Sequence, residues 1–133
     1  MSKGNSTEND ILNFIFNATA MPAYGSTLQV ALHTADPGEG GTLATNEADY
    51  TSYARVSVSR DNTGWTVSGN QSINTAEVTF PECTGGSNTI THCSIGVTAT
   101  GQILYSGALT APIDISNLIT PRFPVGTLVL QED

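Results

Sequence analysis

Apolar residues first recur with the spacing of a helix and then, for most of the chain, with the spacing of strands. The helical face comprises four apolar residues: Ile11, Leu12, Ile15 and Phe16. Thr7, followed three residues later by Asp10, resembles a capping box in which Asp replaces the usual Glu. The pattern predicts a short helix over about 7–18, docked by its apolar side, after a flexible start at 1–6.

From about residue 28, apolar and polar residues alternate with the period of two that a half-buried strand requires. In the first of these stretches, 28–33, the alternation places His33 on the outward side. Further strand-like stretches lie at 53–58, 65–67, 76–80, 89–97, 102–109, 113–119 and 125–130. Seven or eight short strands without intervening helices predict an all-β fold. We expect a single β-sandwich or jelly-roll-like domain over 7–133, with a short N-terminal α-helix.

The net charge of the chain limits the classes of binding partner that we expect. The chain has 133 residues, of which 12 are Asp or Glu and 4 are Lys or Arg, giving a formal net charge of -8. Nucleic acids and anionic membranes bind clusters of basic residues. Because this chain is acidic and has few basic residues, we expect neither as a partner. The first residues lack the pattern of a signal peptide, which is a basic start followed by an apolar segment. We therefore expect synthesis in the cytoplasm.

The candidate chemical groups form no recognisable catalytic or metal-binding motif. His33 and His92 are the two histidines, and neither belongs to a nucleophile or phosphate-loop motif. We expect both to be strand-surface or interface residues. Together with Cys83 and Cys93 they are zinc ligands by type, but their spacing matches no zinc site. The sequence therefore predicts a protein that is not an enzyme and has no cofactor.

Acidic residues gather in the long connection at 36–49. They are Asp36, Glu39, Glu47 and Asp49. Carboxylates of this kind can hold Ca²⁺, but the regular spacing of a calcium loop is missing. We expect a solvated charged loop, with cation binding as the alternative.

The two cysteines are expected to be free thiols. If a hairpin turns near residues 86–87, Cys83 and Cys93 are displaced by about three positions, roughly 10 Å at the rise of a strand. That separation exceeds the reach of a disulfide. A turn centred two residues later would bring them together, so the bonded alternative stays open.

Two parts of the sequence are candidates for a protein interface. Tyr53 and Arg55 share the polar side of one predicted strand, and Tyr and Arg are enriched at the anchoring positions of interfaces. The helix is the second candidate, with Ile11, Ile15 and Phe16 as contact residues. It could serve as an attachment arm or could close one end of the sandwich.

The order of several stretches resembles a family of small virion proteins of tailed bacteriophages. The stretches are LQVALHTADPGEGGT (28–42), YARVSVSR (53–60), AEVTFPEC (76–83), ITHCSIGV (90–97), ILYSGALTAPIDIS (103–116) and PVGTLVLQED (124–133). The resemblance extends from about residue 8 to the end. The chain departs from the pattern at Cys93, where an aromatic residue is common, and at Ser106, both of which look like packing substitutions.

This resemblance implies a structural component of the virion, made in the cytoplasm of the host bacterium, and brings no catalytic residues with it. A single domain without a repeated or coiled-coil shaft favours a capsid decoration (cement) protein on the outer surface of the phage head. Its expected partners are the major capsid protein and itself, as a homo-oligomer and possibly a trimer. The alternative is a tail-tip or fibre-associated module that recognises the host surface.

Overall fold

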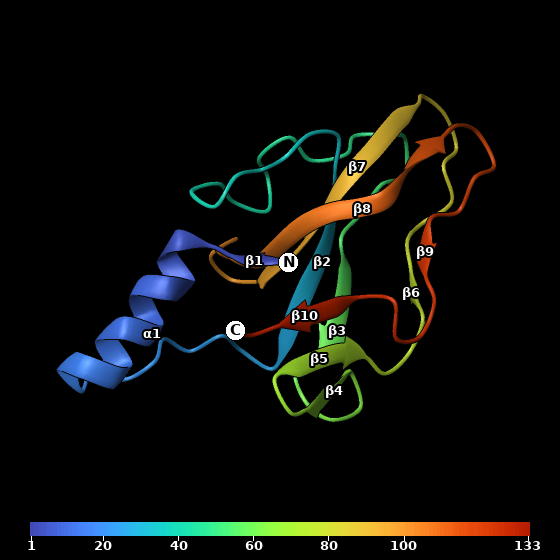
Figure 1. The fold of residues 1–133 in the computed structure, drawn as a ribbon. Coiled ribbons are helices and arrows are strands. Elements are labelled where there is room, and N and C mark those ends of the chain that lie inside the picture. The colour runs from blue at the N-terminus through green and yellow to red at the C-terminus, as the bar shows by residue number, and fades with distance from the viewer.

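Strands make up most of the computed structural model, which describes residues 1–133 (Figure 1). In chain order the elements are β1 (Ser2–Lys3), α1 (Asn5–Asn17), β2 (Thr27–His33), β3 (Val56–Ser59), β4 (Trp65–Ser68), β5 (Gln71–Asn74), β6 (Val78–Thr79), β7 (Asn88–Val97), β8 (Ile103–Ile115), β9 (Arg122–Phe123) and β10 (Val129–Gln131). The prediction of an all-β fold with one short helix is confirmed.

Five strands form the largest sheet, in the order β1-β8-β7-β2-β3, and every neighbouring pair is antiparallel. The two longest strands, β7 and β8, pair with each other along most of their length. The pairing is interrupted at Thr91 of β7, and residues 109–112 of β8 have no partner there. Pro112 lies in this unpaired segment, and proline has no N–H to give to a ladder. The interruption explains why the sequence pattern predicts two strands where the structure has one.

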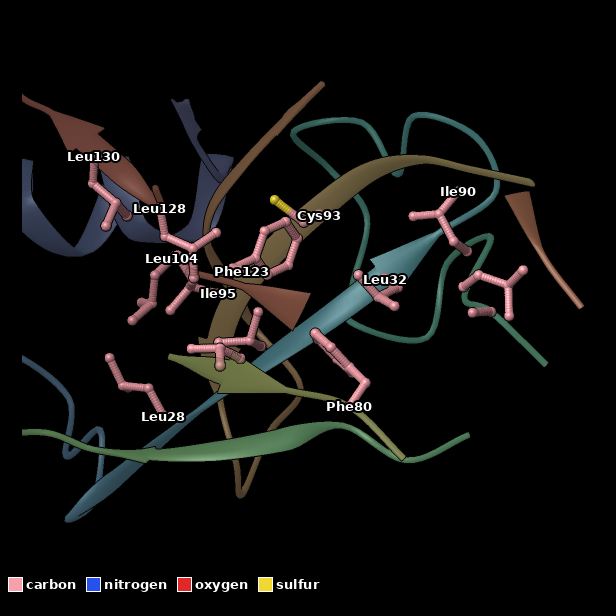
Figure 2. Close-up of a cluster of buried hydrophobic side chains, with 14 of the residues drawn as sticks. Leu28, Leu32, Phe80, Ile90, Cys93, Ile95, Leu104, Phe123, Leu128 and Leu130 are labelled. Atoms are coloured by element: carbon pink, nitrogen blue, oxygen red, sulfur yellow. The ribbon is translucent and has the colours of Figure 1, made fainter. Parts of the chain in front are cut away.

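The second layer consists of two smaller antiparallel sheets, β10-β5-β4 and β6-β9. Side chains of both face the large sheet across one core, in which Leu32 and Ile95 meet Phe80, Phe123 and Leu128 (Figure 2). The layers are therefore those of a sandwich, but the second layer is split in two.

The opposite face of β2 is also covered, which the alternating pattern does not predict. Ala31 packs there with Leu43, from the long connection between β2 and β3, and with Ile103 of β8. Gly96 makes room for this connection, because a Cβ at Gly96 would lie 2.7 Å from Leu43 Cδ2. Residues on both faces of β2 are therefore buried, His33 among them.

The chain is already ordered at its start. Ser2 and Lys3 pair with Ser106 and Tyr105 of β8, in contrast to the flexible start expected at 1–6. Gly4 follows as the N-cap of α1, where a Cβ would collide with the Ile103 carbonyl oxygen. The helix therefore begins at Asn5 and not at Thr7, and the predicted capping box is wrong.

Candidate interaction surface

The apolar side of α1 faces solvent. Phe16 is 76% exposed, Ile15 60%, and Leu12 and Phe14 55% each, while Ile11 is half-buried. Figure 1 shows the helix extending away from the sheets, with only its start beside them. The expectation that the helix docks by its apolar side is wrong.

Polar side chains hold the helix instead. Thr7 is buried, and its hydroxyl donates to the Ile103 carbonyl at 3.0 Å. One turn later, the Asp10 carboxylate accepts hydrogen bonds from Gln102 Nε2 at 3.0 Å and from the Tyr24 hydroxyl at 3.2 Å. These contacts turn the polar side of the first two turns toward β8. The apolar side, which a folded monomer usually buries, remains open.

A ladder of asparagines borders the apolar side. Asn13 Nδ2 donates to Asn9 Oδ1 at 2.8 Å, and Asn17 Nδ2 donates to Asn13 Oδ1 at 2.7 Å. The last turn contains no basic residue. An exposed group of large apolar side chains on a single element is typical of a protein–protein contact.

Tyr53 and Arg55, the other predicted interface residues, meet at Glu47. The Tyr53 hydroxyl donates to Glu47 Oε1 at 2.9 Å and accepts from the Leu32 N–H at 3.1 Å. Arg55 donates from Nε to Glu47 Oε1 at 2.6 Å and from Nη2 to Glu47 Oε2 at 2.8 Å. Burial is the main cause that raises the pKa of Tyr53 above its usual value. Both side chains thus fasten the long connection to the large sheet.

The five residues predicted to form an interface lie at two separate places in the structure. Ile15 and Phe16 lie on the exposed side of α1, and Ile11 is half-buried one turn before Ile15. Tyr53 and Arg55 lie elsewhere, around Glu47. An interface role for each of the five stays a prediction.

His33 is fully buried, so its predicted place on the strand surface is wrong. A carbonyl oxygen can only accept, so His33 Nδ1 donates to Thr45 O at 2.8 Å. In the neutral ring Nε2 then accepts from the Ser94 hydroxyl at 2.6 Å. Burial lowers the pKa of His33. This arrangement joins the long connection, β2 and β7, and is that of a structural histidine.

The acidic residues of the long connection do not converge. Glu47 is bound to Arg55 and Tyr53, while Asp49 Oδ1 accepts from Asn88 Nδ2 at 2.8 Å and Asp36 Oδ1 accepts from the Gly38 N–H at 2.8 Å. Nowhere in the chain do three or more His, Cys, Asp or Glu side chains lie close enough together to share a metal ion.

Cys83 and Cys93 are both buried and free, as predicted. The geometry behind that prediction is different, because β6 pairs with β9 and not with β7. Cys83 Sγ donates to Gly85 O at 3.1 Å, and burial raises the pKa of the Cys93 thiol to about 12. Neither thiol is disposed to react in the folded protein.

The sequence gives no signal for a cavity of about 830 Å³ that opens between the large sheet and the β10-β5-β4 sheet. Its apolar wall includes Leu28, Ile95, Leu104 and Leu130, on one side of the core in Figure 2. Trp65, the only tryptophan, also lines it. The indole N–H of Trp65 is the only buried side-chain polar atom without a hydrogen-bond partner.

Residues 2–131 match the family described as podophage GP4 fiber I protein gp80. The chain belongs to this family. No curated protein shows significant similarity to it.

Membership of the Gp80 family confirms the resemblance to small virion proteins of tailed phages. The chain is therefore a structural component of a bacteriophage virion, and its family is a structural one. Its single helix is too short and too polar to cross a bilayer.

Proposed function

We propose that the chain is a fibre-associated structural component of the phage virion and that α1 makes its assembly contact. The observation that carries the fibre assignment is the match of residues 2–131 to a fibre protein family. The contact is inferred from the open apolar side of α1, where Leu12, Ile15 and Phe16 are all more than half exposed.

A capsid decoration protein is the second candidate, with the major capsid protein as its partner. It is favoured by the single small domain without a repeated or coiled-coil shaft. The two roles differ in stoichiometry, because a decoration protein covers the shell in many copies and a fibre component is present in few. The amount of this chain in purified particles, relative to the major capsid protein, distinguishes them. A shell-saturating amount would overturn the fibre assignment.

The contact is tested by incorporation into particles. Phe16→Asp places a charge on the exposed side of α1, and Leu118→Asp places the same charge at a 70% exposed position in the loop between β8 and β9. Phages carrying each change are purified and their protein content is compared. We expect loss of the Phe16→Asp chain from particles and retention of the Leu118→Asp chain. Retention of both at wild-type amounts would remove α1 from the assembly contact.

A further inference from the structure

The β10-β5-β4 sheet joins the rest of the domain at one of its two ends. The register pairs Trp65 with Asn74 and Ile73 with Val129, so these residues mark the same end of the sheet. The connections 60–64, 75–77 and 124–128 all meet the sheet there. The opposite end contains the turn at 69–70 and the residues that follow β10.

A buried side chain fixes the attached end. Asn74 Nδ2 donates to the carbonyls of Ala76 at 2.8 Å and Pro124 at 3.0 Å, and its Oδ1 accepts from the Leu128 N–H at 3.0 Å. Asn74 thereby binds two of the three connections and is fully buried. This end of the sheet is therefore held in place by several hydrogen bonds.

The opposite end is held to the large sheet by one ion pair. Glu132, just after β10, is bound to the β4–β5 turn, because its N–H donates to Asn70 O at 2.8 Å and its carbonyl accepts from Asn70 Nδ2 at 2.7 Å. Its carboxylate accepts from Lys3 Nζ, on β1, at 2.5 Å. Of the three ion pairs in the chain, this is the one that joins the large sheet to the second layer.

The cavity lies between the layers along this sheet. Leu28 and Leu104 line it from the large sheet and Leu130 from the smaller one, and each retains 7–9% exposure. Asn70 and Glu132 line the cavity as well, at the end that carries the ion pair. Movement of that end away from the large sheet would therefore expose an apolar floor.

We propose that the β10-β5-β4 sheet is a flap, fixed at its Asn74 end and clasped at its other end by the Lys3–Glu132 ion pair, that opens to expose the apolar cavity. When the ion pair breaks, the free end moves away from β1 and β8 while the three strands stay paired with one another. Motions of this kind need changes at only a few residues in connections or at the ends of elements. The inference goes beyond the proposed function, because α1 takes no part in it.

Opening is measured by the reactivity of a thiol placed under the flap. Leu104→Cys puts a thiol on the cavity floor, where a bulky maleimide reaches it only in the open state. At low reagent concentration the labelling rate follows the population of that state. Cys93 is the internal reference, because it is buried and does not line the cavity. Mass spectrometry of peptides gives both rates from one sample.

Two substitutions remove the clasp, each in the Leu104→Cys chain. They are Lys3→Gln and Glu132→Gln, and Glu77→Gln is the matched control because it removes the exposed Arg122–Glu77 pair within the second layer. We expect labelling at position 104 to become about two- to fivefold faster in both clasp variants, in keeping with the modest strength of a partly exposed ion pair. Glu77→Gln leaves this rate unchanged, and the Cys93 rate is the same in all chains.

Charge reversal and salt test whether the effect comes from the ion pair itself. The double variant Lys3→Glu/Glu132→Lys restores the wild-type rate at position 104, because the pair is re-formed with its charges exchanged. In about 1 M NaCl, where the Debye length is about 3 Å, labelling of the chain with Lys3 and Glu132 approaches the rate of the clasp variants. The same salt leaves the rate of Lys3→Gln unchanged.

A second measurement leaves Leu104 in place. Trp65, the only tryptophan, lines the cavity, and its quenching by acrylamide reports access to it. Acrylamide is uncharged, so its own approach does not depend on the substituted charges. We expect stronger quenching in Lys3→Gln and Glu132→Gln and wild-type quenching in Glu77→Gln, with circular dichroism verifying the fold of each chain.

Three results overturn the proposal. Unchanged labelling and quenching in both clasp variants would mean that the ion pair does not hold the flap. Equal acceleration at position 104 and at Cys93 would mean that the pair only stabilises the whole fold. Failure of the reversed pair to restore the rate would remove the ion pair as the cause. None of these results bears on the proposed function, which is tested through Phe16.

Discussion

At the scale of single residues, the buried polar groups act as joints between segments that are distant in sequence. Asn74 is fully buried, and its amide donates to the carbonyls of Ala76 and Pro124 while its Oδ1 accepts from the Leu128 N–H. His33 joins Thr45 and Ser94 in a similar way. Alternation along 28–33 placed His33 on the outward face. The pattern within one strand does not show that a distant loop folds back and covers that face.

Burial of neutral His33 predicts a loss of stability in acid. Its pKa is lowered in the folded state, mainly by burial, from the ordinary 6.5. As pH falls below about 6.5, the unfolded chain therefore binds a proton that the folded chain does not, and the free energy of unfolding decreases. Urea unfolding between about pH 7 and pH 5, above the range where most carboxylates titrate, measures this slope.

In His33→Gln the slope over this interval becomes smaller, because the group that takes up the proton on unfolding is gone. An equal slope in wild type and His33→Gln would contradict the assignment of a buried neutral histidine.

Tyr53 provides a test of a predicted interface residue. Tyr53→Phe leaves the Leu32 N–H without its acceptor and removes one donor from Glu47. We expect a loss of about 1–2 kcal/mol in the free energy of unfolding and no change in assembly. Urea unfolding and light scattering measure the two quantities. Wild-type stability combined with lost assembly would show that Tyr53 acts in an interface and not within the chain.

At the scale of elements, the sequence pattern located the helix and most strands but not their partners. Strands β2, β7 and β8 overlap predicted stretches because alternation of apolar residues marks them directly. The pairing of β6 with β9 joins segments more than 40 positions apart, and two-residue strands have no pattern of their own. The orientation of α1 was missed because two polar residues, Thr7 and Asp10, make its contacts with Gln102 and Ile103 at the start of β8.

The orientation of α1 predicts effects of different size for two substitutions in the helix. Thr7→Ala removes a buried hydroxyl that donates to Ile103 O and accepts from Gln102, and we expect a cost of about 1–2 kcal/mol. Phe16→Asp changes an exposed side chain and alters the free energy of unfolding by less than about 0.5 kcal/mol.

Both are measured by urea unfolding at low chain concentration, where mass action removes any contribution from assembly. A cost at Phe16 equal to that at Thr7 would mean that the apolar side of α1 packs against its own chain.

At the scale of the whole molecule, the charge is mainly negative, with 12 acidic and 4 basic residues. Three of the four basic residues are paired with carboxylates within the chain, and the fourth, Arg60, lines the cavity together with Asp61 and Glu132. The cavity could not be predicted from the sequence, because its wall is made of strand ends from both layers. The absence of nucleic acid and membrane partners stays a prediction from the charge.

The central claim, a fibre-associated component of the virion, is tested most directly by locating the chain on an intact particle. Antibody raised against the purified chain is bound to whole phages, and the label is imaged by electron microscopy. The account predicts label on the tail fibres, lost when Phe16→Asp replaces the wild-type chain and kept with Leu118→Asp. Label spread over the outer surface of the head would contradict it and would support the decoration role.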